Sequence, residues 1–218
     1  MKILVAVPSY DGKVHCRCTQ SLICNVQSLK KEGHDVLTCF HMSDCYITRA
    51  RNFIVHTFLQ TDCTDLIFVD SDLSFDDGAF CKLMNHDKDI IAGAYPFKGE
   101  AGYPVHLLFD SNNNCKDEST GLVNAEIAPT GLMRIKRNVF DSLNSFYKFK
   151  PDNNGMIHYF AEGVVMPEDN CWYGEDVVFC KRVIKAGLKI WIETDINFTH
   201  YGSKGYRGNY KEYLTKGV

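Results

Sequence analysis

The chain has 218 residues, of which 45% are hydrophobic and 23% are charged, and its formal net charge is -3 at pH 7. A chain of this length and apolar content can bury one sizeable core, so we predict a single domain over residues 1–218. The slightly acidic balance lacks the broad basic field that nucleic-acid binders use. We therefore expect no nucleic-acid partner.

Two features bear on the cellular compartment. The apolar run from Ile3 to Val7 is ended by Pro8 and is too short for a signal-peptide core or a membrane span. The ten cysteines include no C-x-x-C pair and are scattered, so we expect reduced thiols. Together these features predict a cytoplasmic protein without a membrane span.

Short apolar runs alternate with segments of helical periodicity in the first half of the chain. Buried strands are predicted at residues 3–7, 36–40, 66–69 and 90–94. This alternation predicts an α/β fold with a central, mostly parallel sheet flanked by helices.

Helices are predicted between these strands. The first helix ends near Gly33, because glycine is a common C-terminal stop. Ser74 followed by Asp77 resembles a capping box, which predicts a third helix carrying Phe80 and Met84. The apolar stripes of the first two helices are Cys18, Leu22, Val26 and Leu29, and Ala50, Ile54 and Phe58.

The second half of the chain is less regular, and we expect the sheet to become mixed there. A helix is predicted from about Glu175 to Gly187, with Val177, Cys180 and Ile184 on one side. Strands are predicted at 103–109, 132–135 and 188–192, and turns at 111–114 and 152–155.

The end of the chain is rich in Gly, Lys and Tyr from Gly202 onward, which favours a flexible tail over residues 204–218. Its basic side chains Lys204, Arg207 and Lys211 either fold over a bound diphosphate or remain solvated.

The most informative motif follows the third predicted strand, where Leu66 to Val69 runs directly into Asp70-Ser71-Asp72. Residues i and i+2 of an extended chain face the same side, so the two carboxylates can converge on one cation. The carboxyl edge of a parallel sheet is also where open α/β folds bind ligands. A D-x-D triplet is common in turns and helix caps, but its position after a buried strand favours a metal site.

Two further motifs carry groups of the same chemistry. Gly174-Glu175-Asp176 begins the last helix, where acidic residues are often only surface groups stabilised by the helix dipole. His200 follows the last strand region, and a neutral imidazole is a suitable ligand for a divalent transition metal. Each motif alone is compatible with a structural role, and the three together are more specific.

With these motifs the sequence resembles the glycosyltransferases of the GT-A (nucleotide-diphospho-sugar transferase) fold. Within them it is especially similar to the N-terminal glycosyltransferase domains of chlorella-virus multidomain proteins. The resemblance runs through nearly the whole chain and lies in the order of Val7-Pro8-Ser9-Tyr10, Ala50-Arg51-Asn52, Asp70-Ser71-Asp72, Pro129-Thr130-Gly131, Gly174-Glu175-Asp176 and His200.

The resemblance implies a division of the chain into a nucleotide-sugar-binding half, about 1–100, and an acceptor-binding half, about 101–203. It also implies a viral protein that acts in the host cytoplasm and can be joined to further domains. Unlike many relatives, this sequence has no obvious pair of acids after its second strand, which leaves recognition of the base open.

The resemblance also implies roles for individual residues. Asp72 and His200 would bind the metal, with Asp70 as a direct or water-mediated partner. The ligand types favour Mn²⁺, with Mg²⁺ as the alternative. Asp176 would be the general base, with Glu175 beside it. The nucleotide-sugar site would comprise Pro8, Ser9, Tyr10, Asp44, Arg51, Asp70, Ser71, Asp72, Thr130 and Gly131.

These roles imply a metal-dependent hexosyltransferase of glycan biosynthesis that transfers a hexose or deoxyhexose from a UDP-sugar to a hydroxyl of a glycan or glycoprotein. UDP is favoured by analogy of fold alone. One alternative is a sugar-phosphate nucleotidyltransferase, although its Gly-rich phosphate loop is not evident in Pro8-Ser9-Tyr10-Asp11-Gly12. The other is a non-catalytic nucleotide- or sugar-binding module.

Overall fold

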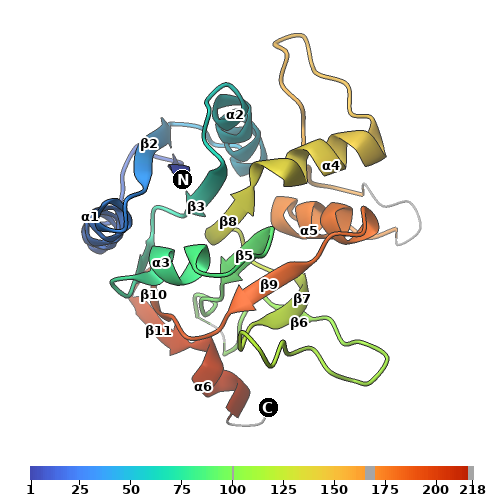
Figure 1. Ribbon diagram of the computed structural model, residues 1–218. Coiled ribbons are helices and arrows are strands. Elements are labelled where there is room, and N and C mark those ends of the chain that lie inside the picture. Colours follow the sequence, from blue (N-terminus) through green and yellow to red (C-terminus); the bar gives the residue numbers. More distant parts are fainter. Residues whose placement is uncertain (100, 165–169, 216–218) are drawn as a thin grey trace.

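The computed structural model describes residues 1–99, 101–164 and 170–215, which form two sheets and the helices around them (Figure 1). The elements are, in chain order, β1 (Lys2–Ser9), α1 (Cys16–Lys31), β2 (Asp35–Met42), α2 (Ile47–Leu59), β3 (Asp65–Val69), β4 (Leu73–Phe75), α3 (Ala79–Met84), β5 (Ile90–Gly93), β6 (His106–Leu107), β7 (Val123–Ile127), β8 (Leu132–Lys136), α4 (Arg137–Tyr147), α5 (Glu175–Lys185), β9 (Ile190–Glu193), β10 (Asn197–Tyr201), β11 (Gly205–Asn209) and α6 (Tyr210–Thr215).

The large sheet has the strand order β2-β1-β3-β8-β5-β9-β7-β6. β1 is parallel to both β2 and β3, and β5 is parallel to β9. β8 is antiparallel and lies between β3 and β5, and β7 and β6 are also antiparallel to their neighbours. The α/β class and the mixed sheet are therefore confirmed.

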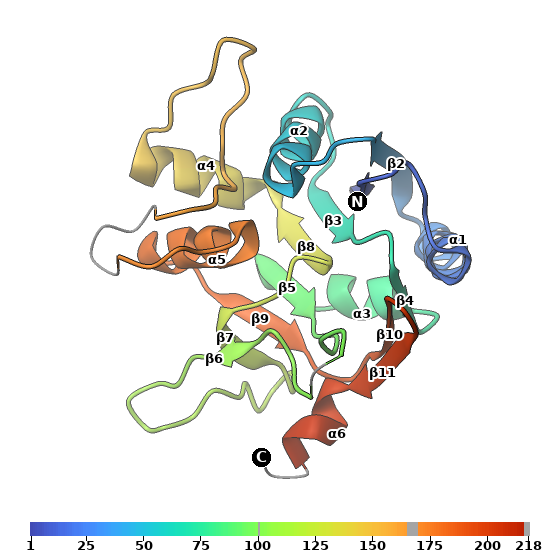
Figure 2. The ribbon, with the colours of Figure 1, turned by 180° about the vertical axis from the view of Figure 1, so that it is seen from behind.

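Helices cover both faces of this sheet (Figures 1 and 2). Alternate side chains of β1 point to opposite faces, as the two-residue period of a strand requires. Leu4 and Ala6 pack in one core cluster with α2, α4 and α5, whereas Ile3, Val5 and Val7 pack in the other with α1 and α3. The central strands are consequently buried on both sides, which explains why their sequences are continuous apolar runs.

The small sheet has the order β11-β10-β4, and all its pairs are antiparallel. The predicted capping box is wrong, because Ser74 lies inside β4 opposite Thr199 of β10. Helix α3 instead begins at Ala79, after Gly78 in the left-handed region at φ 82°. Phe80 and Met84 of this helix are buried as expected.

Regular structure continues beyond Gly202, where the composition suggested a flexible tail. β11 pairs with β10 along five residues, and Tyr210 of α6 is buried with its ring centroid 5.0 Å from that of Tyr103. Gly208 is needed for this packing, because a Cβ at that position would collide with the Tyr103 hydroxyl. Residues 216–218 of the predicted tail lie outside the described residues.

Two other expectations are corrected in detail. The strand expected at 103–109 is confined to His106–Leu107, and in Figure 1 the chain after it runs into a long projecting loop. The buried side of α5 is formed by Val178, Phe179, Cys180 and Val183, whereas Val177 is only half-buried.

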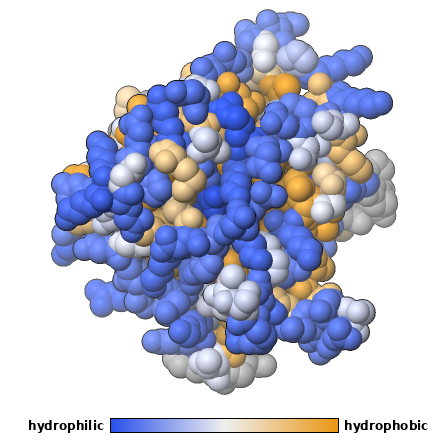
Figure 3. Space-filling view, in the orientation of Figure 1, coloured by the Kyte–Doolittle hydropathy of each residue, from blue (hydrophilic) through white to orange (hydrophobic). Residues whose placement is uncertain are grey.

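The surface and the cysteines complete the description. All ten cysteines are free, as expected for reduced thiols. The face seen in Figure 3 is mainly hydrophilic, with scattered hydrophobic patches. Within residues 1–99, 101–164 and 170–215, no helix is long and apolar enough to cross a membrane.

Candidate functional site

The ends of four neighbouring strands meet at one edge of the large sheet. β1 and β3 are parallel and end there, and so does β5, since both β3 and β5 are antiparallel to β8. β8 begins at this edge, and the Gly131 carbonyl accepts a 2.8 Å hydrogen bond from the Asp70 N–H. The D-x-D and Thr130-Gly131 motifs are therefore adjacent.

Arg51 connects the D-x-D motif with Gly174-Glu175-Asp176. It lies near the start of α2, and its side chain is 3% exposed. Nη2 donates to Asp70 Oδ1 at 2.9 Å, and Nε donates to Glu175 Oε1 at 3.0 Å. Burial lowers the pKa of Arg51, but Asp70 and Glu175 outweigh it and raise that pKa above its ordinary value. The guanidinium is a permanent cation between two carboxylates.

Tyr95 lies on the other side of Asp70. Its hydroxyl donates to Asp70 Oδ2 at 3.4 Å, and burial, followed by the charge of Asp70, raises the Tyr95 pKa well above its ordinary value. Glycine is required at position 131, because a Cβ there would lie 2.6 Å from Asp70 Oδ2 and even nearer the Tyr95 hydroxyl. Tyr95 is consequently a protonated donor held against the D-x-D motif.

Asp176 is in the first turn of α5, beside Glu175. Burial, followed by the charge of Glu175, raises the pKa of Asp176, and Asp70 acts in the same direction. Asp176 also contributes, with Asp70 and Asp72, to the raised Tyr95 pKa. The structure thus brings the carboxylates of the two acidic motifs into one electrostatic neighbourhood. A carboxylate with a raised pKa is a stronger base when it is ionised.

Asp70 and Asp72 have different partners, contrary to the expectation for an extended chain. β3 ends at Val69 and the chain turns at Ser71 and Asp72, so the period of two does not apply. Asp72 Oδ2 accepts a hydrogen bond from Lys98 Nζ, whereas Asp72 Oδ1 lies 3.6 Å from His200 Nε2.

The orientation of His200 is fixed by a main-chain carbonyl. His200 Nδ1 lies 2.9 Å from the Pro96 oxygen, which can only accept, so Nδ1 carries the proton. Burial lowers the His200 pKa, which favours the neutral ring with a lone pair on Nε2. Nε2 and Asp72 Oδ1 then present lone pairs to each other, an arrangement that suits a cation between them.

Asp72 and His200 are the two residues that fit a divalent cation. Within the described residues, no group of three or more His, Cys, Asp and Glu side chains forms a metal cluster, and the Asp70 oxygens bond to Arg51 and Tyr95. Mg²⁺-type sites commonly use one or two carboxylates and complete their coordination with water and substrate phosphates. The donor set fits a cation that is shared with a diphosphate.

The end of β1 and Tyr10, which follows it, lie at the same edge of the sheet. Pro8 and Ser9 are buried, and Ser9 Oγ donates to the Lys13 carbonyl at 2.6 Å. Tyr10 is 72% exposed, so its ring is free to stack on a ligand. Ser71 is held in place through its main chain, because its carbonyl accepts a 2.8 Å hydrogen bond from the His15 N–H.

Asp44 is not among the residues that contact Asp70 or Asp72. It is buried at the end of β2 and accepts hydrogen bonds from Arg49 at 2.8 and 2.9 Å. These bonds hold the pKa of Asp44 well below its usual range. The structure therefore pairs Asp44 with Arg49.

Thr130 lies next to Gly131, just before β8, and its side chain is buried. Its side chain is 1% exposed, and Oγ1 has no hydrogen-bond partner among the residues that the structure describes. A buried hydroxyl without a hydrogen-bond partner is unusual, and this one lies directly before Gly131, whose carbonyl contacts the D-x-D motif.

Sequence reasoning missed Tyr95 and Lys98. Both follow strand β5, so the rule that drew attention to Asp70, a polar side chain after a buried strand, applies to them as well.

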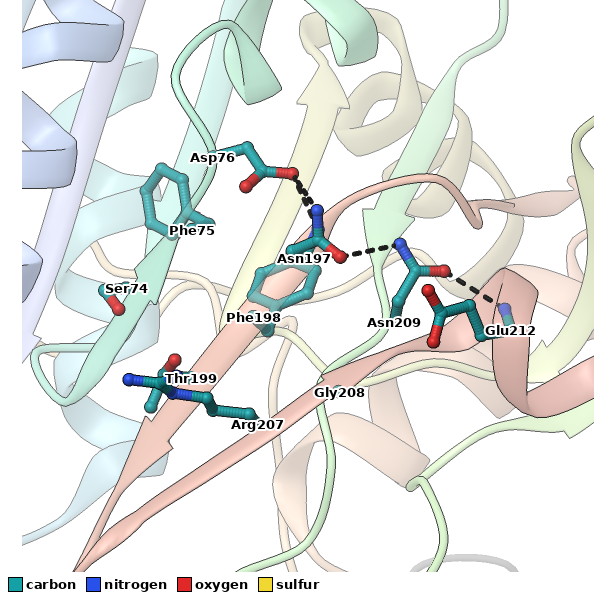
Figure 4. A pocket seen from close by; sticks show the side chains of 10 residues that line it. All are labelled: Ser74, Phe75, Asp76, Asn197, Phe198, Thr199, Arg207, Gly208, Asn209 and Glu212. Carbon is teal, nitrogen blue, oxygen red and sulfur yellow. Dashed lines mark hydrogen bonds between the residues drawn. The ribbon is translucent and has the colours of Figure 1, made fainter.

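A pocket of about 440 Å³ lies on the small sheet and contains none of the acidic motif residues. Thr199 lines this pocket, whereas His200 is not among its lining residues. In Figure 4, Asp76, Asn197 and Asn209 are joined by hydrogen bonds to one another. These three polar side chains of the pocket therefore already have hydrogen-bond partners within it.

The chain is similar in structure to three GT-A-type glycosyltransferases. The similarity to GalNAc-T7 with UDP, GalNAc and Mn²⁺ has a TM-score of 0.48 and 12% identity over 87% of this chain and 42% of that chain. A glycosyltransferase involved in the glycosylation of the major capsid of PBCV-1 gives 0.35 and 8%, over 65% and 63%. S. aureus TarS, residues 1–349, gives 0.46 and 15%, over 89% and 58%.

This chain thus spans less than two thirds of the length of each of these solved chains. No protein-family model and no curated protein matches the sequence. At these TM-scores the similarity does not assign an activity, so the proposal below depends on the site itself.

Proposed function

We propose that this chain is a metal-dependent glycosyltransferase that moves a hexose or deoxyhexose from a UDP-sugar to a hydroxyl of a glycan or glycoprotein. The observation that carries this proposal is the Arg51 bridge, which joins Asp70 to Glu175 at 2.9 and 3.0 Å. It brings the acidic D-x-D motif and a second acidic motif to one sheet edge. A glycosyl transfer needs one acidic group to hold the cation that neutralises the donor diphosphate and another to take the proton of the acceptor hydroxyl.

In this proposal Asp72 and His200 hold Mn²⁺ or Mg²⁺, and Asp70 is a nearby partner positioned by Arg51 and Tyr95. When bound, the cation would stabilise negative charge on the departing diphosphate. The imidazole of His200 favours Mn²⁺ over Mg²⁺, which prefers oxygen ligands.

The chain's own residues bind and orient the two substrates. The segment Pro8-Ser9-Tyr10 borders the nucleoside, and the main chain at Thr130 and Gly131 lets the donor sugar or the acceptor approach closely. Asp176 takes the proton of the acceptor hydroxyl as the new glycosidic bond forms. Its raised pKa supports this role, because the group is partly buried and close to other carboxylates.

The experiment that tests this function is a thermal-shift panel of UDP, GDP, CMP and dTDP, each with Mn²⁺, Mg²⁺ or chelator. A ligand that binds the folded state raises the melting temperature by mass action. We expect the largest rise for UDP with Mn²⁺. No shift with any nucleotide and metal would contradict the proposal.

Turnover separates the remaining activities. UDP release from UDP-sugars indicates a glycosyltransferase, whereas pyrophosphate release from UTP and a sugar phosphate indicates a nucleotidyltransferase. Binding of UDP without either reaction indicates a binding module.

A further inference from the structure

Lys98 lies on the loop after β5 and contacts Asp72 of the D-x-D motif. It follows β5, and its Nζ donates to Asp72 Oδ2, so a monovalent cation occupies one oxygen of the carboxylate assigned to the metal. The Lys98 side chain is 38% exposed and that of Asp72 is 36% exposed. The ion pair is thus accessible to solvent and to an incoming metal ion.

The loop that carries Lys98 is anchored on the β10–β11 hairpin. The Pro96 carbonyl accepts a hydrogen bond from His200 Nδ1 of β10, and within the loop the Phe97 N–H donates to the Gly102 carbonyl at 3.1 Å. The aliphatic part of Lys98 passes over Gly202, where a Cβ would lie 3.1 Å from Lys98 Cδ. The Pro96–His200 hydrogen bond and the packing on Gly202 therefore hold Lys98 beside Asp72.

Lys98 and Arg51 differ in how firmly they are held. Arg51 is buried and bonded to two carboxylates, whereas Lys98 has a flexible stem and an exposed ion pair with one. An exposed ion pair of this kind is weak, so a divalent cation can replace Lys98 at small cost.

We propose that Lys98 is a displaceable counter-ion of Asp72: it competes with the divalent cation for this carboxylate and, once displaced, binds the diphosphate of the donor. This inference rests on the proposed function. It follows from charge, since a diphosphate bound beside Asp70, Asp72 and Glu175 needs more positive charge than the metal and Arg51 provide.

The proposal predicts opposite effects of one substitution on two ligands. Lys98→Met removes the competitor for Asp72, so Mn²⁺ should bind the nucleotide-free protein about two- to fivefold more tightly, the range that an exposed ion pair allows. The same variant lacks a cation for the diphosphate, so UDP should bind about two- to tenfold more weakly at saturating Mn²⁺. A purely structural ion pair would not separate these two effects.

The experiment uses the full chain without nucleotide. Mn²⁺ binding is measured from the electron paramagnetic resonance signal of free Mn²⁺, and UDP binding from calorimetry at saturating Mn²⁺. The control is Lys116→Met, which removes a lysine from a more exposed ion pair, Lys116 and Glu118 at 3.0 Å, in the loop before β7. Lys98→Arg keeps the charge and should retain the wild-type Mn²⁺ affinity. Melting in chelator shows that each variant is folded.

Opposite shifts in Lys98→Met, absent from Lys116→Met, support the proposal. If Lys98→Met binds Mn²⁺ and UDP as the wild type does, or binds both more weakly, Lys98 is not a displaceable counter-ion and the proposed function is unaffected. If neither protein binds Mn²⁺ or UDP, both the Lys98 proposal and the proposed function are overturned.

Discussion

Arg51 donates a 2.9 Å hydrogen bond to Asp70 from a position where only 3% of its side chain is exposed. The same guanidinium bonds to Glu175, so one buried cation holds the two acidic motifs together.

Arg51→Met should lower the free energy of unfolding by about 3 kcal/mol, the lower end of the range for a broken buried ion pair, because Asp70 is a quarter exposed. Urea unfolding measures the change. Arg17→Met, on the exposed side of α1, is the control and should change stability by no more than about 0.5 kcal/mol. Equal effects of the two substitutions would show that the bridge is not structural.

Asp72→Asn should abolish the Mn²⁺-dependent part of UDP binding while the protein remains folded. The substitution removes a partly exposed charge and leaves the core intact, so the melting temperature in chelator should hardly change. Calorimetry with UDP in Mn²⁺ measures the affinity, and Asp77→Asn, an exposed carboxylate beyond β4, is the matched control. Retained metal-dependent affinity in Asp72→Asn would remove Asp72 from the metal site.

His200→Ala should weaken Mn²⁺-dependent UDP binding less than Asp72→Asn does. A neutral ligand attracts the cation less strongly than a carboxylate, and water can take its coordination position. The ratio of UDP affinities in Mn²⁺ and in Mg²⁺ is the sharper readout, because loss of the imidazole should reduce the preference for Mn²⁺. A larger loss for His200→Ala would reverse the proposed ranking.

Asp176→Asn should leave UDP binding nearly intact and reduce transfer by at least about 10²-fold, because it keeps the shape of the side chain and removes the basic oxygen. UDP release from a UDP-sugar in the presence of acceptor measures the rate. Near-normal turnover would assign Asp176 to a structural role at the start of α5, and lost UDP affinity would place it in the donor site.

The pH dependence of turnover should reflect the raised pKa of Asp176, which is caused first by burial and then by Glu175. The base acts when ionised, so kcat should fall as pH decreases through this raised pKa. For stability the sign is opposite to that of a salt-bridged carboxylate, since protonation of Asp176 at low pH relieves an unfavourable buried charge. An acid limb that persists unchanged in Asp176→Asn would belong to another group.

Much of the large sheet could be predicted because its strands are apolar on both faces. β1 and β3 are continuous buried runs, and α2 has a clear stripe with Ala50, Ile54 and Phe58 buried. The position of β8 between β3 and β5 could not be predicted, because Leu132 pairs with Val69, 63 positions earlier in the chain, and no local pattern records that partner. The segment after Gly202 forms more regular structure than its composition predicts. A high glycine content favours flexibility, but Gly208 is needed because it makes room for Tyr103.

Residues of the candidate site that directly follow a strand could be predicted from the sequence. Those on a loop that folds back onto the site could not. Asp70 and Asp72 were found from their position after β3, although the turn at Ser71 gives them separate partners. Lys98 was missed because its contact with Asp72 depends on the loop after β5 lying on the hairpin near Gly202. Such a contact leaves no periodic signal in the sequence.

A calorimetric titration of the wild-type chain with UDP, once with Mn²⁺ and once with chelator, tests the central claim most directly. If Asp72 and His200 hold a cation that is shared with a diphosphate, UDP should bind at least about tenfold more tightly with Mn²⁺, a difference of about 1.4 kcal/mol. Equal affinity with Mn²⁺ and with chelator would contradict a metal-dependent UDP-sugar site.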